Sequence, residues 1–260
     1  MNPSELHILK KQGKQKSFSP SLEPKNQISK PLALPSTAKF HISLGEALSL
    51  TKAKNDITDA FKKSGFGGTS PGWVFSTDYP LDQSDLFAWN FGIEYNLTHH
   101  LRLGVALKKV PHLEIQGRDK VYENGDGTCY GLLIEYVPAP VSPQFISRFE
   151  FAVGAGLTYN SLSVDGTLSS IRRGSADVDV ESPVSFEVKE NIIGGQLRGS
   201  LDYYFSRSFS LQFRIDGRFV PAVDIPEISH ITHYNIKKTL KQHSVDFSTV
   251  DLSLGLRFHL

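Results

Sequence analysis

The chain lacks the residues that hold small secreted domains and many metal centres together. Among its 260 residues only Cys129 is a cysteine, which excludes an intrachain disulfide and a cysteine-rich zinc site. It has no run of about 18 apolar residues, so we expect no transmembrane helix. The net charge of +1 lacks the basic excess that is typical of nucleic-acid binding, so nucleic acid is not an expected partner.

The first 38 residues differ in composition from the rest. They are rich in Lys, Ser, Pro and Gln and poor in apolar residues, which predicts a disordered, basic and Pro-rich N-terminal segment over 1–38. This segment contains no continuous apolar stretch, so no export signal is visible in it. A single structured domain is expected over 39–260.

Alternation of apolar and polar residues dominates this second part. In the final stretch VDLSLGLRFHL every second residue is apolar, which is the period of a β-strand. Similar segments are 40–50, 87–97, 101–110, 129–137, 149–159, 191–205, 211–219 and, at the end, 250–260. Most are close to the roughly 9–11 residues with which a tilted strand crosses a bilayer.

The connections between these eight segments alternate in length. Short links at 98–100, 138–147 and 206–210 alternate with long links at 51–86, 111–128, 160–190 and 220–245. Short turns on one side and long loops on the other are the layout of bacterial outer-membrane barrels. The predicted fold is therefore all-β: an eight-stranded antiparallel up-and-down transmembrane β-barrel.

The two faces of the segments differ in charge. One face is almost uniformly apolar, with aromatic residues near both ends of the strands. The other carries six acids and six bases among small residues: Glu94, Arg102, Lys108, Glu135, Glu150, Arg198, Asp202, Arg214, Asp216, Arg218, Asp251 and Arg257. The lumen of eight strands is too narrow for rows of aromatic rings, whereas balanced charges can pair inside it. We therefore expect a charge network that plugs the lumen, and aromatic residues in lipid.

The C-terminus carries the most specific motif. Ser253, Gly255, Phe258 and Leu260 match the polar, glycine and hydrophobic positions of a terminal assembly signal, and over roughly 39–260 the chain resembles the OmpA-like and OmpX-like outer-membrane barrels. The resemblance implies the bacterial outer membrane as location, outer-membrane lipids, lipopolysaccharide and the barrel-assembly machinery as partners, and a monomeric state. Function would then reside in the four long loops, through a structural role or a surface ligand. Lys237, Lys238 and Lys241 in the last loop could meet lipid phosphates.

Two other functions stay open at this stage. Some small outer-membrane barrels modify lipid A with Ser and His side chains, and His41 and Ser43 have these residue types, although no catalytic motif surrounds them. A soluble lipocalin-like carrier would need the apolar face inside. The preferred prediction is a protein that is not an enzyme and has no cofactor.

Three local features complete the sequence-based expectations. Glu46 falls on the apolar face, either through a β-bulge or because it lies at the rim, while Leu133 falls on the charged face. His230, His233 and His243 are interpreted as solvated loop histidines and not as metal ligands. The segment ENGDG, 123–127, is interpreted as a turn because of its Asn-Gly and Asp-Gly pairs.

Overall fold

The computed structural model of the chain describes residues 38–66, 68–69, 78–79, 81–82, 84–117, 121–138, 148–168, 183–231 and 237–260. All of these residues belong to one structural unit, Leu32–Leu260. The predicted N-terminal segment 1–38 lies almost wholly outside the described residues, and so does His233.

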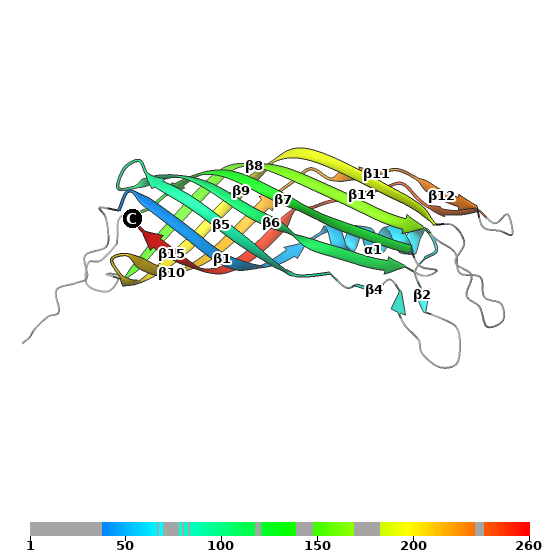
Figure 1. The fold of residues 1–260 in the computed structure, drawn as a ribbon, viewed down its shortest axis with the longest axis horizontal. Helices are drawn as coiled ribbons and strands as arrows, with labels where there is room; N and C mark the ends of the chain where they lie inside the picture. The colour runs from blue at the N-terminus through cyan, green and yellow to red at the C-terminus, as the bar shows by residue number, and fades with distance from the viewer. Residues whose placement is uncertain are drawn as a thin grey trace, which may run out of the picture. The chain divides into compact units, whose positions relative to one another are not determined.

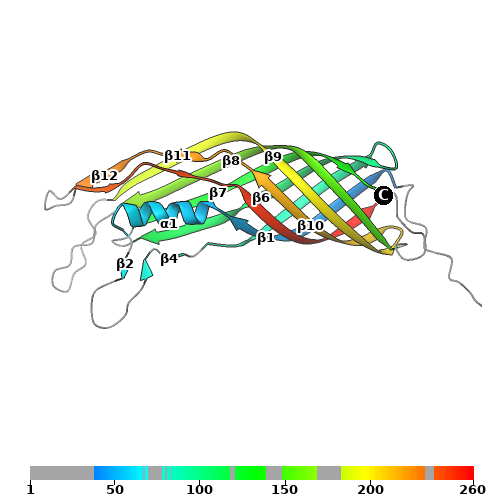
Figure 2. The ribbon, with the colours of Figure 1, turned by 180° about the vertical axis from the view of Figure 1, so that it is seen from behind.

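Eight antiparallel strands close into a barrel (Figures 1 and 2). The strands are β1 (Phe40–Thr51), β5 (Phe87–Asn96), β6 (Leu101–Gly117), β7 (Val121–Tyr136), β8 (Phe149–Leu168), β9 (Val184–Ser206), β10 (Phe209–Phe219) and β15 (Thr249–His259). Each pairs with its neighbours along the chain, and β1 pairs with β15 as well as with β5. The predicted fold class is confirmed.

The apolar face of the strands points outward. Phe213 and Leu254, which are cross-strand neighbours on β10 and β15, are 48% and 51% exposed, whereas Arg257 on the opposite face of β15 is fully buried. A soluble carrier needs the reverse arrangement, because its apolar face would line a dry interior. The lipocalin-like alternative is therefore not the fold of this chain.

Aromatic side chains form a belt at the short-turn end of the barrel. The ring centroids of Phe149 and Tyr203 lie 5.0 Å apart, and those of Phe209 and Phe258 lie 5.6 Å apart. At the other border of the apolar band the rings of Tyr130 and Tyr159 lie 6.3 Å apart. Aromatic belts at two levels are typical of barrels that span a bilayer, since amphipathic rings favour the interfaces.

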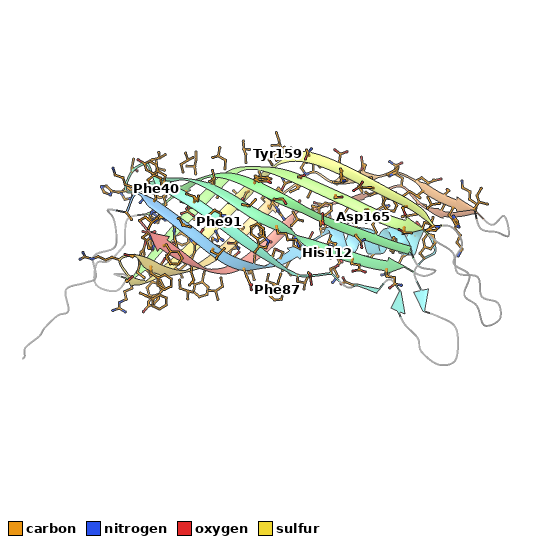
Figure 3. All side chains as sticks on the ribbon, viewed as in Figure 1. Phe40, Phe87, Phe91, His112, Tyr159 and Asp165 are labelled. Atoms are coloured by element: carbon orange, nitrogen blue, oxygen red, sulfur yellow. The ribbon has the colours of Figure 1, made fainter. Side chains whose placement is uncertain are left out.

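Beyond the belt of Tyr130 and Tyr159 the strands continue, but the apolar side chains now lie on the inward face and the polar side chains on the outward face. On β8, Leu162, Val164 and Leu168 point inward and are buried, while Asp165 points outward. In Figure 3, Phe40 lies near one end of the barrel, Tyr159 lies near the middle and Asp165 lies farther toward the other end. The exchange means that this part of the barrel has an apolar interior and a polar exterior, as a protein in water requires.

This extension corrects two predicted loops. Segments 111–128 and 160–190 were expected to be long loops, but β6, β7, β8 and β9 run through most of them. The predicted turn at 123–127 is wrong as well, because the whole segment pairs with β8 on one side and, except for Asp126, with β6 on the other. Pairing on both edges outweighs the local turn preference of Asn-Gly and Asp-Gly.

A β-bulge lies where β6 leaves the apolar band. Between Val110 and Leu113 the register with β7 shifts by one residue, and Pro111 falls at this point. Before the bulge even-numbered side chains such as Lys108 point inward; after it odd-numbered ones such as Ile115 do. Proline is tolerated there because a bulged residue does not need to donate to the ladder.

The predicted loop 51–86 contains a helix, α1 (Ala53–Lys63), which the sequence analysis missed. Ala53, Ile57, Ala60 and Phe61 share one face of the helix and are buried. Lys62 and Lys63 lie in the last turn, where they complement the helix dipole. Gly65 follows with a φ of 82°, a left-handed conformation that favours glycine and ends the helix.

We use the term cap for three parts of the chain that lie together beyond the apolar band. They are helix α1, the segment 220–248 and the outer parts of β6 to β9, which are 110–117, 121–129, 160–168 and 184–192. That last segment forms β11 (Val223–Ile225), β12 (Ile228–Ile231), β13 (Lys237–Leu240) and β14 (His243–Val245), so it too is more regular than the predicted loop 220–245. Short strands β2 (Gly68–Thr69), β3 (Asp78–Tyr79) and β4 (Leu81–Asp82) lie between α1 and β5. In the described part of the chain no helix has the length and apolarity to cross a bilayer.

Glu46 points outward within the apolar band. The register of β1 with β5 and with β15 is unbroken at this position, so the proposed bulge is absent. Leu48 and Leu50, farther along the same face of β1, lie between Glu46 and the cap, so Glu46 does not lie at the rim either. Its neighbours across the strands are Trp89 and Leu254. Leu133 is a buried leucine on the inward face of β7.

Candidate functional site: a sealed lumen

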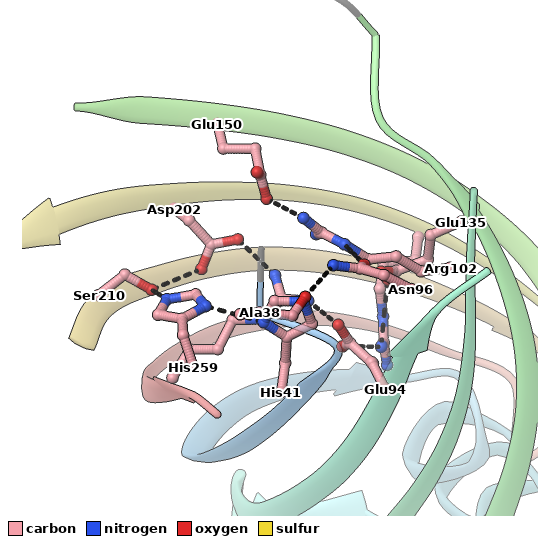
Figure 4. A network of polar contacts seen from close by, with 12 residues as sticks. Ala38, His41, Glu94, Asn96, Arg102, Glu135, Glu150, Asp202, Ser210 and His259 are labelled. Atoms are coloured by element: carbon pink, nitrogen blue, oxygen red, sulfur yellow. Dashed lines mark hydrogen bonds and ion pairs between the residues drawn. The ribbon is translucent and has the colours of Figure 1, made fainter. Parts of the chain in front are cut away.

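The interior of the barrel at the short-turn end is a chain of polar contacts (Figure 4). Asp202 accepts hydrogen bonds from Arg257 Nη1 at 2.6 Å and from Ser210 Oγ at 3.2 Å. His259 Nε2 lies 3.0 Å from Ser210 Oγ, and its Nδ1 lies 2.8 Å from Nδ1 of His41. These residues come from β1, β9, β10 and β15, so the contacts join four strands across the lumen.

Arg102 and Arg257 extend this network across the lumen. Arg102 pairs with Glu150, and Arg257 pairs with Glu94 as well as with Asp202. Arg257 is completely buried. A buried guanidinium that pairs with two carboxylates loses its hydration but gains charge-assisted hydrogen bonds in their place.

Arg198 is the centre of the next layer. Its Nε donates to Asp216 Oδ1 at 2.6 Å, and its Nη1 lies 3.5 Å from Glu135 and 3.9 Å from Glu94. Gln196 donates a second hydrogen bond to Asp216 at 2.9 Å. Together with the pair of Lys108 and Asp251, this layer fills the lumen just below the cap.

The cap closes the same lumen with an apolar core. Leu113, Ile115, Val164 and Phe247 are fully or almost fully buried, and α1 adds Ile57 and Phe61 to them. Figures 1 and 2 show α1 at the end of the barrel opposite the C-terminus. Gly117 on β6 makes this packing possible, since a Cβ atom there would lie 2.9 Å from the ring of Phe61.

Known structures with a similar fold are bacterial outer-membrane proteins. The outer membrane protein OprG of Pseudomonas aeruginosa matches with a TM-score of 0.51 and 11% identity over 86% of this chain and 96% of its own. The chain has the fold of a bacterial outer-membrane β-barrel. This agrees with the resemblance to OmpA-like and OmpX-like barrels that the sequence indicates.

Two further solved structures align at lower similarity. Neisserial surface protein A aligns with a TM-score of 0.42 and 14% identity, over 85% of this chain and 97% of its own. Ail, the attachment invasion locus protein of Yersinia pestis, aligns with a TM-score of 0.40 and 10% identity, over 86% of this chain and 99% of its own. No protein-family model matches the chain, and no curated protein sequence is significantly similar to it.

The outer-membrane barrel brings most of the predicted interior residues together. The following are buried: Glu94, Arg102, Glu135, Arg198, Asp202, Arg214, Asp216, Arg218, Asp251 and Arg257. Glu150 also points inward, but it is only half-buried because it is the second residue of β8, at the short-turn end of the barrel. In the terminal segment Ser253 points inward, Gly255 pairs with Gly45 of β1, and Phe258 and Leu260 point outward.

The sequence analysis missed the polar residues that complete the network. His41, Ser210 and His259 lie on the inward face of their strands, and Tyr204 stacks on His259 with ring centroids 4.7 Å apart. Tyr204, Ser210 and His259 could have been found, since each has the parity of the inward-facing charged residues on its own strand. His41 could not be found in this way, because the charged residue of β1, Glu46, has the opposite parity and points outward. Uncharged side chains were simply not counted as part of the network.

Ser210, His259 and Asp202 have the residue types of a catalytic triad but not its arrangement. The acid accepts from the serine and not from the histidine, and the second ring nitrogen of His259 contacts His41. A triad base has to accept the proton of the serine while the acid orients the base. Ser210 and His259 are also buried in the lumen and away from the lipid-facing surface. His41 and Ser43, considered from the sequence, are buried there too.

His243 links β14 to β7 inside the cap. Its Nε2 lies 3.0 Å from Oε1 of Glu123, which is fully buried, and its Nδ1 lies 2.9 Å from the carbonyl oxygen of Lys241. The sequence-based interpretation of His243 as a solvated loop histidine is therefore wrong. It is wrong for His230 too, which lies on β12 and is 6% exposed. Burial alone would lower the pKa of His243, but the hydrogen bond and charge of Glu123 raise it above its ordinary value of 6.5. In the described part of the chain no cluster of three or more metal-ligating side chains is present.

This contact predicts a pH-dependent cap. A histidine whose pKa is raised on folding stabilises the fold fully below its unfolded pKa, and this stabilisation is lost as pH rises through the raised folded pKa. We therefore expect amide hydrogen exchange in β14 and the facing part of β7 to accelerate, after correction for intrinsic rates, as the pH passes from about 6 to above the folded pKa of His243. His243→Gln should remove this dependence, and an unchanged dependence in that variant would contradict the assignment.

Proposed function

We propose that this chain is a sealed barrel of the bacterial outer membrane with a structural or surface-interaction role and no transport role. The observation that carries the proposal is the double closure of the lumen, by charged side chains within the apolar band and by the apolar core of the cap. Between them the lumen holds a cavity of only about 10 Å³. Within the apolar band every strand of the closed barrel pairs with a strand on each side. No edge is therefore left for a second chain to pair with, which supports a monomer.

Electrical conductance tests this proposal. The purified full chain in a planar lipid bilayer should give no steady nanosiemens current, because the side chains of the described residues fill its lumen. Phe61→Asp, which places a charge in the cap core, should loosen the cap and still give no steady current, since the layer around Arg198 remains. Reproducible, steady openings of the unmodified chain would contradict a sealed barrel.

Lipids are the proposed partners of the outer surface. An apolar groove of about 550 Å³ follows the lipid-facing side of β5 to β9 and is lined by residues such as Phe91, Leu107, Tyr130 and Leu157. Its size and chemistry fit an acyl chain. We propose in addition that Phe258 and Leu260, which point outward at the end of the chain, belong to the signal for the barrel-assembly machinery.

Lipopolysaccharide phosphates are the proposed ligand of the cap. The backbone N–H of Lys241 donates to Ser64 Oγ at 3.0 Å, so the lysines of β13 and the following residues lie near the end of α1. Lys62, Lys63, Lys237 and Lys241 are exposed in this region. Phosphate groups favour clustered cations of this kind, although each contact is weak and salt-dependent.

Charge reversal tests this ligand. Changing Lys62, Lys63 and Lys241 to Glu together should weaken lipopolysaccharide binding by a factor of at least about 10 at low salt. Lys189→Glu is the matched control, since Lys189 is exposed on β9 and already contacts Glu187 at 2.6 Å. Equal binding by the triple variant, or equal binding of dephosphorylated lipopolysaccharide, would contradict the proposal.

A catalytic role receives less support. The Ser210 hydroxyl donates its proton to Asp202 and not to His259, although Nε2 of His259 lies 3.0 Å from Ser210 Oγ. This arrangement supports a protein that is not an enzyme and in which these groups hold strands together.

A further inference from the structure

The small cavity in the lumen lies directly beneath the cap. Its polar walls come from strands β5, β6, β9, β10 and β15, and the charged residues among them are Lys108, Arg198, Arg214, Arg218, Asp216 and Asp251. Cys129 lines the cavity and also belongs to the apolar core of the cap. The cavity is therefore covered by apolar side chains on one side and by the layer around Arg198 on the other. Its volume of about 10 Å³ is room for one guest of about the size of a water molecule.

The walls of this cavity carry an excess of positive charge. Four of the six charged residues that line the cavity are cations and two are carboxylates, which leaves two positive charges in excess within the lining. Glu135, which is outside the lining, lies 3.5 Å from Arg198 and offsets one of them. Asp251 pairs with Lys108, and Asp216 accepts hydrogen bonds from Arg198 and Gln196. Both carboxylates are therefore already engaged by cations other than Arg214 and Arg218.

Arg218 is a cation of the cavity wall whose charge no carboxylate pairs with among the described residues. It is 3% exposed, and none of its three guanidinium nitrogens makes a hydrogen bond to a described residue. Nη1 of Arg214 and both polar side-chain atoms of Asn90, Nδ2 and Oδ1, are likewise buried and make no hydrogen bond to a described residue. Buried charges in native proteins are paired, since an isolated charge in a low-dielectric interior is very unfavourable.

We infer that this cavity binds a small monovalent inorganic anion of the size of chloride. Such an anion accepts hydrogen bonds from Arg218, Arg214 and Asn90 at once and offsets part of the positive excess. A water molecule fits the space but carries no charge, and a phosphate or carboxylate ligand is too large for it. The anion is a structural counter-ion that enters as the barrel folds, because the cap and the Arg198 layer cover the cavity afterwards.

Crystallography with bromide tests this site without any variant. The full chain is unfolded in urea, refolded into detergent in a bromide buffer and crystallised from that buffer. The expected result is an anomalous bromide peak within hydrogen-bond distance of the Arg218 guanidinium. The absence of a peak at this position, in crystals that show bromide elsewhere or nowhere, would overturn the inference and would indicate a water molecule.

Thermal unfolding gives a second readout. Replacement of chloride by gluconate, which is too large for the cavity, should lower the unfolding midpoint of the refolded chain by roughly 5 °C. Arg218→Met should show no such difference, whereas Arg207→Met, which changes an exposed arginine in the turn after β9, should behave like the unmodified chain. Equal anion effects in all three proteins would reveal general salt screening and overturn the inference.

Discussion

Arg257→Met is expected to destabilise the barrel by about 3–5 kcal/mol, because it removes one partner of two buried carboxylates. Arg257 is fully buried, donates to Asp202 at 2.6 Å and also pairs with Glu94. Methionine fills a similar volume but leaves both acids without their cation. The measurement is the free energy of unfolding in urea, with the full chain folded in phospholipid vesicles.

Two comparisons separate the ion pairs from general effects of mutation. Arg207→Met alters an exposed arginine and should change the free energy of unfolding by less than about 0.5 kcal/mol. Adding Glu94→Gln and Asp202→Asn to Arg257→Met should restore most of the lost stability, since no uncompensated buried charge then remains. A single variant Arg257→Met as stable as the unmodified chain would contradict the internal network.

Deletion of Phe258 to Leu260 is expected to prevent closure of the barrel. Leu260 exchanges backbone hydrogen bonds with Phe40, at 2.9 and 3.3 Å, and Phe258 pairs with Ile42. His259 additionally links β15 to His41 and Ser210. An unclosed edge in hydrocarbon leaves backbone groups unpaired at a cost of several kcal/mol each, so the truncated chain should show no heat-modifiable gel mobility.

Folding with and without the assembly machinery distinguishes closure from recognition. The truncated chain should fail to fold both in cells, exported behind a functional signal sequence, and in purified vesicles that contain no assembly machinery. Failure only in cells would assign these residues to recognition alone. A truncated chain that keeps its heat-modifiable mobility in both settings would contradict both roles.

The barrel itself could be predicted from the sequence because its two faces are chemically so different. Alternation at Phe213 and Arg214, or at Leu254 and Arg257, defines both the strand and the direction of each side chain. The number of strands and the order of short and long connections follow from the same pattern. Pairing partners such as Arg198 and Asp216 could not be predicted, since parity places a residue inside the lumen but does not fix its height relative to other strands.

The cap was missed because its alternation is the opposite of that in the barrel. Leu162, Val164 and Leu168 continue the strand with apolar side chains on the formerly charged face, so a search for one uniform pattern ends at Tyr159. The bulge at Pro111 shifts the parity of β6 and hides its continuation in the same way. Helix α1 is short, and its apolar face is recognisable only once a core for it to cover is known.

Glu46 is the residue for which neither sequence-based explanation holds. It lies on an unbroken strand within the apolar band, where a charged side chain that faces lipid is destabilising. Nothing in the structure explains why a glutamate occupies this position.

The direction of the apolar face is the central claim, and the fluorescence of Trp89 tests it most directly. Trp89 is 45% exposed on the outer face of β5, and Trp73→Phe leaves it as the single tryptophan. In vesicles of brominated phospholipid, Trp89 should be strongly quenched, whereas a single tryptophan placed in the lumen by Leu133→Trp, with Trp73 and Trp89 both changed to Phe, should not be. Quenching of the tryptophan at 133 and not of Trp89 would show that the charges face outward, and would contradict the barrel orientation on which every other inference depends.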